Sequence, residues 1–189
     1  IAIISKKPMT DIVMDLPTIE DKERRVLGAT IGDTRILNLY APNGQSVDSE
    51  KYQYKLKWFD ALHDYVKGQL KKYPKLMIVG DLNVAPEDRD VYDPAAWEGS
   101  VLVSPKERKA LQKVMSLGLS DAFRLFDQPE ESYSWWDYRH LAFQRNMGLR
   151  LDLILVSEEL AKKCKSCSID KSLRKADRPS DHTAVVVEF

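Results

Sequence analysis

The most informative stretch of the sequence is Val79-Gly80-Asp81-Leu82-Asn83-Val84-Ala85-Pro86. It follows the apolar run 76–79, which is bounded by a proline and a glycine and predicts a buried strand. Asp81 and Asn83 come directly after this strand, two residues apart. In α/β folds the ends of strands collect binding and catalytic groups, although Asp and Asn also commonly cap turns. The stretch therefore predicts either a catalytic strand end or a capped turn, and the rest of the chain has to decide.

The composition is that of an ordinary globular protein. The chain has 189 residues, of which 43% are hydrophobic and 31% charged, and this suffices for one domain, residues 1–189, with its own core. No apolar run is long enough to span a bilayer, so we expect no membrane partner. Cys164 and Cys167 do not make a secreted disulfide framework, so we expect a cytoplasmic location. Their spacing also occurs in redox sites, but the flanks lack the βαβ context of such a site.

The charge is balanced in total but not along the chain. There are 29 Lys and Arg against 29 Asp and Glu, whereas residues 139–178 contain ten basic and five acidic residues, a surplus of five. A locally basic face can hold a polyanion even on a neutral protein. Such a segment is also commonly a plain solvated surface. The charge pattern therefore permits nucleic-acid binding without establishing it.

The hydrophobic pattern alternates between strand and helix periods, which predicts an α/β fold with helices covering a sheet. A long helix is indicated by apolar residues at steps of three and four, and a second one by Ser104, Pro105 and Glu107, which match a capped helix start. The predicted strands are 1–4, 24–31, 35–40, 76–79, 133–138, 149–156, 167–169 and 183–189, and the predicted helices are 48–72, 104–117 and 157–163.

Asp152 is the most informative single residue because it lies inside the apolar run 149–156. A buried carboxylate is costly unless it is paired. His182, which follows Asp181 at the start of the last predicted strand, is a natural partner. An Asp–His pair fixes the imidazole tautomer and stabilises the protonated form that can bind a phosphate oxygen. A structural salt bridge to Arg150 is the alternative.

Polar groups at the predicted strand ends suit metal-assisted cleavage of a phosphodiester. They offer the hard oxygen ligands that Mg²⁺ prefers, and there are too few Cys and His for a zinc site. A carboxylate can activate water, a metal can neutralise charge, and amide, phenol and imidazole groups can bind the phosphate. The set comprises Tyr40, Asn43, Asp81, Asn83, Asp152, Asp181 and His182.

Four groups of residues, in this order along the chain, match a known pattern. They are Asn38-Leu39-Tyr40-Ala41-Pro42-Asn43-Gly44, then Gly80-Asp81-Leu82-Asn83, then Tyr133-Ser134-Trp135-Trp136 with Asn146-Met147-Gly148-Leu149-Arg150-Leu151-Asp152, and finally Ser180-Asp181-His182. Together they resemble exonuclease III, the bacterial branch of the apurinic/apyrimidinic (AP) endonucleases in the endonuclease/exonuclease/phosphatase superfamily. The second and fourth groups indicate only the superfamily, whereas the third indicates the DNA-repair branch.

The resemblance implies a four-layered α/β sandwich in which two packed β-sheets are flanked by helices. It implies a monomeric DNA-repair enzyme that cuts double-stranded DNA 5′ to abasic sites and trims 3′ ends, with Mg²⁺ or Mn²⁺ as cofactor. A superfamily phosphatase acting on a non-nucleic-acid phosphoester, such as an inositol phosphate or a sphingolipid, is one alternative. An inactive DNA-binding module is another.

The resemblance also implies roles for individual residues. Asp81 would orient or deprotonate the attacking water, and Asn83 would donate to the reacting phosphate. Asp152 would orient His182, which binds the same phosphate, and Asp181 would help to hold the metal. Contact with the phosphate or the leaving group is implied for Tyr40 and Asn43, a pocket for the flipped-out abasic sugar for Trp135, Leu149 and Leu151, and insertion into the duplex for Gln45 and Arg139.

Two family motifs are absent from this sequence. Family members begin with a strand that carries a Trp-Asn motif, followed by a Gln-Glu motif whose glutamate is a principal metal ligand. The chain corresponds to the C-terminal two-thirds of the family pattern, and it opens without Met on the apolar residues 1–4. We therefore expect an N-terminally incomplete domain that binds Mg²⁺ poorly and is weakly active or inactive by itself.

Overall fold

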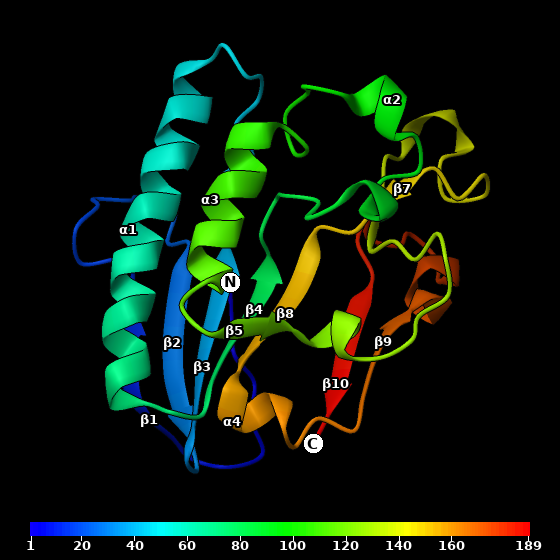
Figure 1. The fold of residues 1–189 in the computed structure, drawn as a ribbon. Helices are drawn as coiled ribbons and strands as arrows, with labels where there is room; N and C mark the ends of the chain where they lie inside the picture. Colours follow the sequence, from blue (N-terminus) through cyan, green and yellow to red (C-terminus); the bar gives the residue numbers. More distant parts are fainter.

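The computed structural model describes residues 1–189 and shows a mixed α/β fold (Figure 1). The strands are β1 (Met9–Met14), β2 (Val26–Ile31), β3 (Thr34–Tyr40), β4 (Leu76–Asp81), β5 (Leu119–Asp121), β6 (Trp135–Trp136), β7 (Gly148–Leu149), β8 (Asp152–Ser157), β9 (Ser166–Asp170) and β10 (Ala184–Glu188). The α-helices are α1 (Glu50–Lys72), α2 (Pro94–Trp97), α3 (Pro105–Met115) and α4 (Glu158–Ala161). The short 3₁₀ helices are η1 (Asp88–Asp90), η2 (Ala122–Leu125), η3 (Arg139–Leu141) and η4 (Lys171–Lys175).

One large sheet organises the molecule. Its six strands are arranged in the order β1-β2-β3-β4-β8-β5, and two separate pairs, β10-β9 and β6-β7, complete the strand content. β2 and β3 form the hairpin that the sequence predicts, and β3 runs parallel to β4 with α1 as the crossover between them. β4 and β8 are antiparallel. The C-terminal end of β4 and the N-terminal end of β8 therefore lie at the same end of the sheet.

The neighbouring strands β4 and β8 pack on both faces, which explains why their sequences are almost continuously apolar. Leu76 and Ile78 of β4 face a core formed with α1 and α3, while Met77 and Val79 face a second core formed with β9 and β10. β8 alternates in the same way. The layers are thus two helices, a six-stranded sheet and a two-stranded sheet (Figure 1). The predicted mixed α/β fold with packed sheets is confirmed.

Both long helices begin and end close to where the sequence predicts. The side chain of Ser49 accepts a hydrogen bond from the backbone N–H of Tyr52 at the start of α1. Ser104 and Glu107 form the predicted capping box of α3. The apolar stripe of α1 packs on the sheet, as a helix of this period should. None of the helices combines the length and the apolar character that crossing a bilayer requires.

The prediction of a buried strand over residues 1–4 is wrong. This segment is irregular, and the side chain of Ile4 is 96% exposed. The edge of the large sheet beside β2 is occupied instead by β1, a strand that the sequence analysis did not predict. The segment is fixed mainly by the side chain of Asn38, whose Nδ2 donates to the carbonyl oxygen of Ala2 at 2.8 Å. Apolar character alone did not decide which segment joined the sheet.

The predicted strand over 149–156 is divided into β7 and β8. Arg150 and Leu151 lie between them because the backbone N–H of Arg150 donates to the carbonyl oxygen of Asp90 at 3.0 Å and leaves the sheet. The predicted strand over 133–138 is likewise reduced to the two residues of β6. Local pattern identified these strands, but contacts distant in sequence set their ends.

Gly80 provides a stability test at the end of β4. Its φ is +120°, and a Cβ at this position would lie 2.1 Å from the carbonyl oxygen of Leu39. We expect Gly80→Ala to lower the free energy of unfolding by about 3 kcal/mol or more, because the clash is with backbone of the neighbouring strand. Urea unfolding measures the change.

Gly68→Ala is the matched control, since a Cβ there meets nothing within 4 Å. Gly68 lies inside α1, where Ala is favoured over Gly by about 0.5–1 kcal/mol. Equal effects of the two substitutions would contradict the steric argument.

Candidate active site

The predicted catalytic residues meet at one end of the large sheet, where the strands β3 and β4 end and β8 begins. Tyr40 at the end of β3 is the register partner of Asp81 at the end of β4, and Asp81 is the register partner of Asp152 at the start of β8. His182 joins them from the segment before β10, where it forms an isolated bridge with Trp135. Residues from five parts of the chain thus converge, as the strand-end argument predicts.

The centre of this cluster is a chain of ionisable groups in the order Asp152, His182, Asp81. Nδ1 of His182 lies 2.8 Å from Oδ2 of Asp152, and its Nε2 lies 4.0 Å from Oδ2 of Asp81. The predicted Asp152–His182 pair is therefore confirmed by the geometry. The alternative pairing with Arg150 is wrong, because that guanidinium binds the carboxylates of Asp90 and Asp121 at 2.7 Å each.

The environment raises the pKa of both Asp81 and His182. Burial and the charge of Asp152 raise the pKa of Asp81 to about 7, although His182, the N–H of Asn83 and Lys55 act in the opposite direction. Burial acts to lower the pKa of His182, but the hydrogen bond and charge of Asp152 outweigh it, so the net pKa is raised. A carboxylate with a pKa near neutrality is suited to act as a general base.

Asn83 fixes the carboxylate of Asp81. Its backbone N–H donates to Oδ1 of Asp81 at 2.8 Å and its Nδ2 to Oδ2 at 2.9 Å. The same Nδ2 also donates to the carbonyl oxygen of Ala41, and Oδ1 accepts from Asn43. Both side-chain N–H groups of Asn83 are thus used within the protein. Positioning of Asp81 is the role that this geometry supports, and the phosphate contact stays a prediction.

A buried ammonium lies beneath these loops, and the sequence analysis did not identify it. Nζ of Lys55 donates to the carbonyl oxygens of Asn43 at 3.0 Å and of Asn83 at 2.6 Å, and it forms an ion pair with Glu107. Position 55 follows Tyr52 by three residues on the buried stripe of α1. A lysine on an otherwise apolar stripe was the available signal.

Ser134 is a second support that the sequence analysis missed. Its Oγ accepts hydrogen bonds from the backbone N–H groups of Leu151 and Asp152, both at 3.0 Å. Its carbonyl oxygen accepts from the N–H of Thr183, next to His182. Ser134 is fully buried and therefore ties β8 to the segment that carries the histidine.

The predicted sugar pocket is built differently from the expectation. Nε1 of Trp135 donates to Oδ2 of Asp181 at 3.0 Å, which joins two of the predicted residues. Leu149 and Leu151, however, are 0% and 2% exposed, because they pack in a core cluster with Leu102. They support Trp135 from beneath and present no surface of their own to a ligand.

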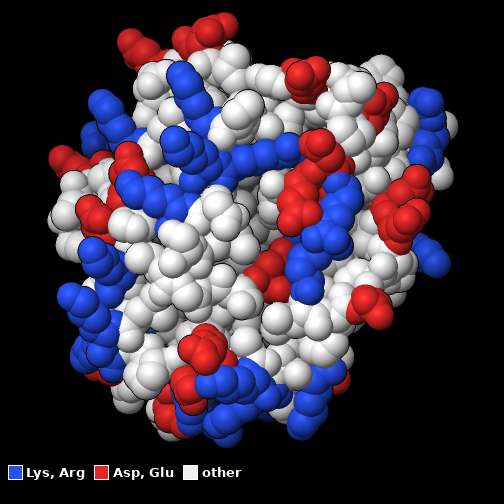
Figure 2. Space-filling model, viewed as in Figure 1, with Lys and Arg blue, Asp and Glu red and all other residues white.

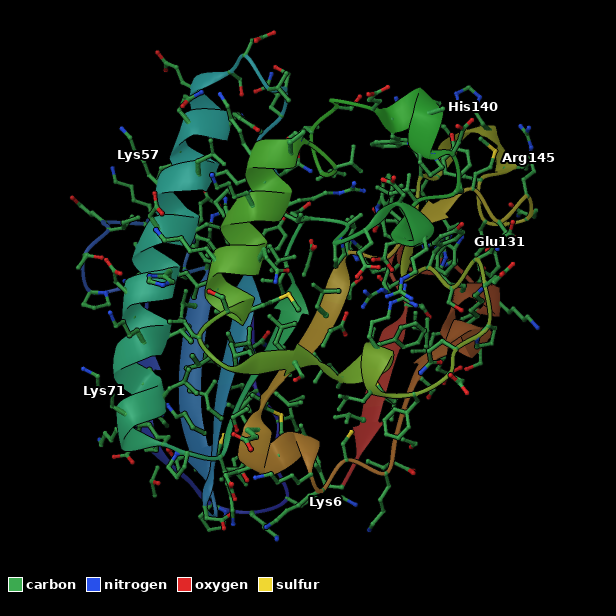
Figure 3. All side chains as sticks on the ribbon, in the orientation of Figure 1. Lys6, Lys57, Lys71, Glu131, His140 and Arg145 are labelled. Carbon is green, nitrogen blue, oxygen red and sulfur yellow. The ribbon has the colours of Figure 1, made fainter.

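The two residues expected to enter a duplex lie on exposed loops. Gln45 follows Asn43 in the loop after β3, and its N–H donates to Oδ1 of that residue at 3.1 Å. Arg139 lies at the start of η3 and pairs with Asp137 at 2.9 Å. Figure 3 shows this second loop, with the labelled His140, at the outer edge of the molecule. Insertion into DNA stays a prediction for both.

The basic surplus of residues 139–178 is only partly available to a partner. Arg150 is buried between two carboxylates, and Arg174 is buried against the rings of Trp136 and Phe143. On the face with α1 and α3, acidic and basic side chains are interspersed without a large patch of one sign (Figure 2). A cavity of about 660 Å³ beside the site is lined by Glu23, Arg25, Tyr40, Pro42, Asn43, Gly44, Gln45, Lys51 and Tyr54.

The residues of this chain do not form a metal cage. No group of three or more His, Cys, Asp or Glu side chains is placed to hold an ion. Mg²⁺, however, is commonly held by one or two carboxylates together with water and substrate phosphate. Asp181 fits such a site, because Trp135 occupies only one of its oxygens and the other accepts only a long 3.5 Å hydrogen bond from the hydroxyl of Ser180.

Comparisons with known proteins find similar sequences. The model of the endonuclease/exonuclease/phosphatase family matches residues 1–182. Exodeoxyribonuclease III of Haemophilus influenzae is 33% identical over 100% of this chain and 76% of the relative. An exodeoxyribonuclease of Bacillus subtilis is 32% identical over 93% of this chain and 70% of the relative.

Solved structures are similar as well. A 3′ phosphatase from Neisseria bound to a product DNA hairpin is 40% identical with a TM-score of 0.96, over 98% of this chain and 72% of that one. An AP endonuclease from Archaeoglobus fulgidus is 34% identical with a TM-score of 0.92, over 97% of this chain and 72% of that one.

Ser134→Ala tests the support of β8. It leaves two buried backbone N–H groups without an acceptor, so we expect the free energy of unfolding to fall by about 1–3 kcal/mol. Urea unfolding measures this. Ser132→Ala is the control from the same loop, because Ser132 is only half-buried and its hydroxyl binds only the carbonyl oxygen of Pro129. Similar losses in both variants would contradict the assigned role.

Asp81→Asn tests the raised pKa through the pH dependence of stability. Because the pKa of Asp81 is higher folded than unfolded, the stability from its protonated form is fully present below the unfolded value and is lost as the pH rises through about 7. Between pH 5 and pH 8 the wild type should lose on the order of 2 kcal/mol more than the variant. Exposed Asp60→Asn should show the wild-type pH dependence.

Proposed function

The chain belongs to the endonuclease/exonuclease/phosphatase family, and we propose that it is a DNA-repair nuclease that hydrolyses the backbone 5′ to abasic sites and trims 3′ ends. The observation that carries this proposal is the Asp152–His182–Asp81 chain at the sheet edge. The similarity to two exodeoxyribonucleases and to an AP endonuclease supports the same reaction class.

In the proposed reaction Asp81 is the general base. Its pKa of about 7 lets it accept a proton from the attacking water at neutral pH, and Asn83 keeps its carboxylate oriented. His182 is held by Asp152 through Nδ1, so that Nε2 points away from this partner and donates to a phosphate oxygen. The Asp81 carboxylate and the imidazolium thereby act on the water and on the phosphate, respectively.

Further contacts would bind the phosphate and the flanking backbone. Tyr40 is 43% exposed, and Asn43 is also exposed, so their hydroxyl and amide groups are accessible beside Asp81. The adjoining cavity is lined by Lys51 and by Arg25, although Arg25 also pairs with Asp21 at 3.3 Å. Backbone phosphates are the chemical class that such groups bind, in a salt-dependent manner. The Neisseria relative, which was solved with a DNA hairpin, supports DNA as the substrate.

We propose that the reaction requires Mg²⁺ or Mn²⁺, with Asp181 as a ligand from this chain. Oδ1 of Asp181 accepts only from the hydroxyl of Ser180 at 3.5 Å, and this weakly held oxygen and its position next to His182 support the assignment. When bound, the ion would neutralise the charge that develops on the phosphate. Substrate phosphate and water, which commonly complete the coordination of Mg²⁺, would supply further ligands beside Asp181.

Cleavage of a labelled duplex with one abasic analogue tests the proposal. In line with the weak activity expected above, we expect slow but Mg²⁺-dependent incision 5′ to the site, and none with EDTA. Asp81→Ala should lower kcat about 10²- to 10⁴-fold, because it removes the general base. The control Asp60→Ala, which changes an exposed aspartate of α1, should retain wild-type activity.

Three outcomes would contradict the proposal. A folded chain that hydrolyses an inositol phosphate but leaves the abasic duplex intact would be a phosphatase of the same family. A folded chain that binds the duplex without cutting it would be a DNA-binding module. Incision that survives Asp81→Ala would show that the base lies elsewhere.

A further inference from the structure

Lys55 is the most completely enclosed charged group near the site. Its side chain and that of its partner Glu107 are both 0% exposed. An ammonium has three N–H donors, and all three are used here: on the carbonyl oxygens of Asn43 and Asn83 and on the carboxylate of Glu107. Since Lys55 has no access to solvent, it cannot touch a substrate, and any effect on the reaction must pass through its neighbours.

Glu107 holds the ammonium from a rigid position. One of its oxygens also accepts from the backbone N–H of Leu102 at 3.0 Å, and the other accepts from the N–H of Ser104 at 3.2 Å and from its hydroxyl. The hydroxyl of Tyr52, one turn before Lys55 on α1, lies 2.7 Å from the same Ser104 oxygen. The ion pair therefore joins α1 to the start of α3.

We propose that Lys55 is a positioning residue for phosphodiester cleavage, with its ammonium holding the loops of Asn43 and Asn83 in register and placing a fixed positive charge behind Asp81. The inference rests on the function proposed above. The two carbonyl groups belong to loops that follow different strands, β3 and β4. Because Lys55 donates to both carbonyl oxygens, it fixes the side-chain amide of Asn43 relative to the side-chain amide of Asn83, which orients Asp81.

The charge of Lys55 has a second consequence at Asp81. The groups that face this carboxylate are Asp152 from β8, His182 from the segment before β10, Lys55 from α1 and the amide of Asn83. Burial and Asp152 raise the pKa of Asp81, and Lys55 is among the groups that lower it. The ammonium of Lys55 thus limits how far the pKa of Asp81 is raised.

A purely structural role does not account for this pair. Burial lowers the pKa of Lys55, and the charge and hydrogen bond of Glu107 act in the opposite direction. Buried ion pairs can often be replaced by apolar residues without loss of stability. A pair kept for stability alone would not need to direct both remaining donors at the loops of the site.

The test compares Lys55→Met/Glu107→Gln with Lys57→Met. The double variant removes both buried charges, so no uncompensated ion is left in the core. Lys57 lies on the same helix and points into solvent (Figure 3), and its replacement serves as the control. The measurements are thermal unfolding, kcat and KM for the abasic duplex, and the pH dependence of kcat.

We expect the double variant to fold, with kcat lowered about 10- to 100-fold and KM changed less than about 3-fold, because the loops are displaced rather than the binding surface removed. The rising limb of its pH profile should move to higher pH, because Asp81 loses a nearby positive charge. Lys57→Met should change none of these quantities. A folded double variant with wild-type kcat and an unmoved limb would overturn the inference.

Glu107→Gln keeps the proposal testable if the double variant fails to fold. It removes the partner that sustains the buried ammonium, so the pKa of Lys55 falls further, the positive charge behind Asp81 is weakened and the rising limb should move to higher pH. A limb that stays in place or moves to lower pH contradicts the inference. Absence of incision by the wild-type chain would instead overturn the proposed function, so the two failures are distinguishable.

Discussion

Two carboxylates that face each other across neighbouring strands are the constraint on which the site depends. Asp81 and Asp152 are register partners on β4 and β8, and like charges in this position repel. The repulsion, together with burial, raises the pKa of Asp81, and His182 inserted between them compensates part of it. The position of this acid–base pair thus depends on strand register, because a one-residue shift of either strand would turn its carboxylate to the other face of the sheet.

The loop between Asp81 and Val91 is held by two buried cations from different elements. Lys55 of α1 binds the carbonyl oxygen of Asn83 near the start of this loop, and Arg150 binds the carboxylate of Asp90 near its end. Each cation is expensive to bury without a partner, and each has at least one carboxylate partner. The energetic cost of these groups is consistent with a site that must be rigid although it lies on loops.

The sequence predicted those parts that local pattern controls. The β2–β3 hairpin, α1 and the capped α3 follow from period, turn residues and capping residues, each of which acts within a few positions. The Asp152–His182 pair was also predictable, because a carboxylate inside an apolar strand requires a partner and few candidates exist. Local reasoning failed for residues 1–4, because apolar character does not say which segment occupies a sheet edge.

The sequence by itself therefore determined the α/β class, the identity of the central carboxylates and their histidine, and the family to which the chain belongs. Only the tertiary structure decided how these groups are supported. Lys55, Ser134 and the division of the predicted strand at Arg150 all depend on partners distant in the chain. The physical reason is that a buried polar group is specified by the donors and acceptors that surround it, and these come together only when the sheet and helices pack.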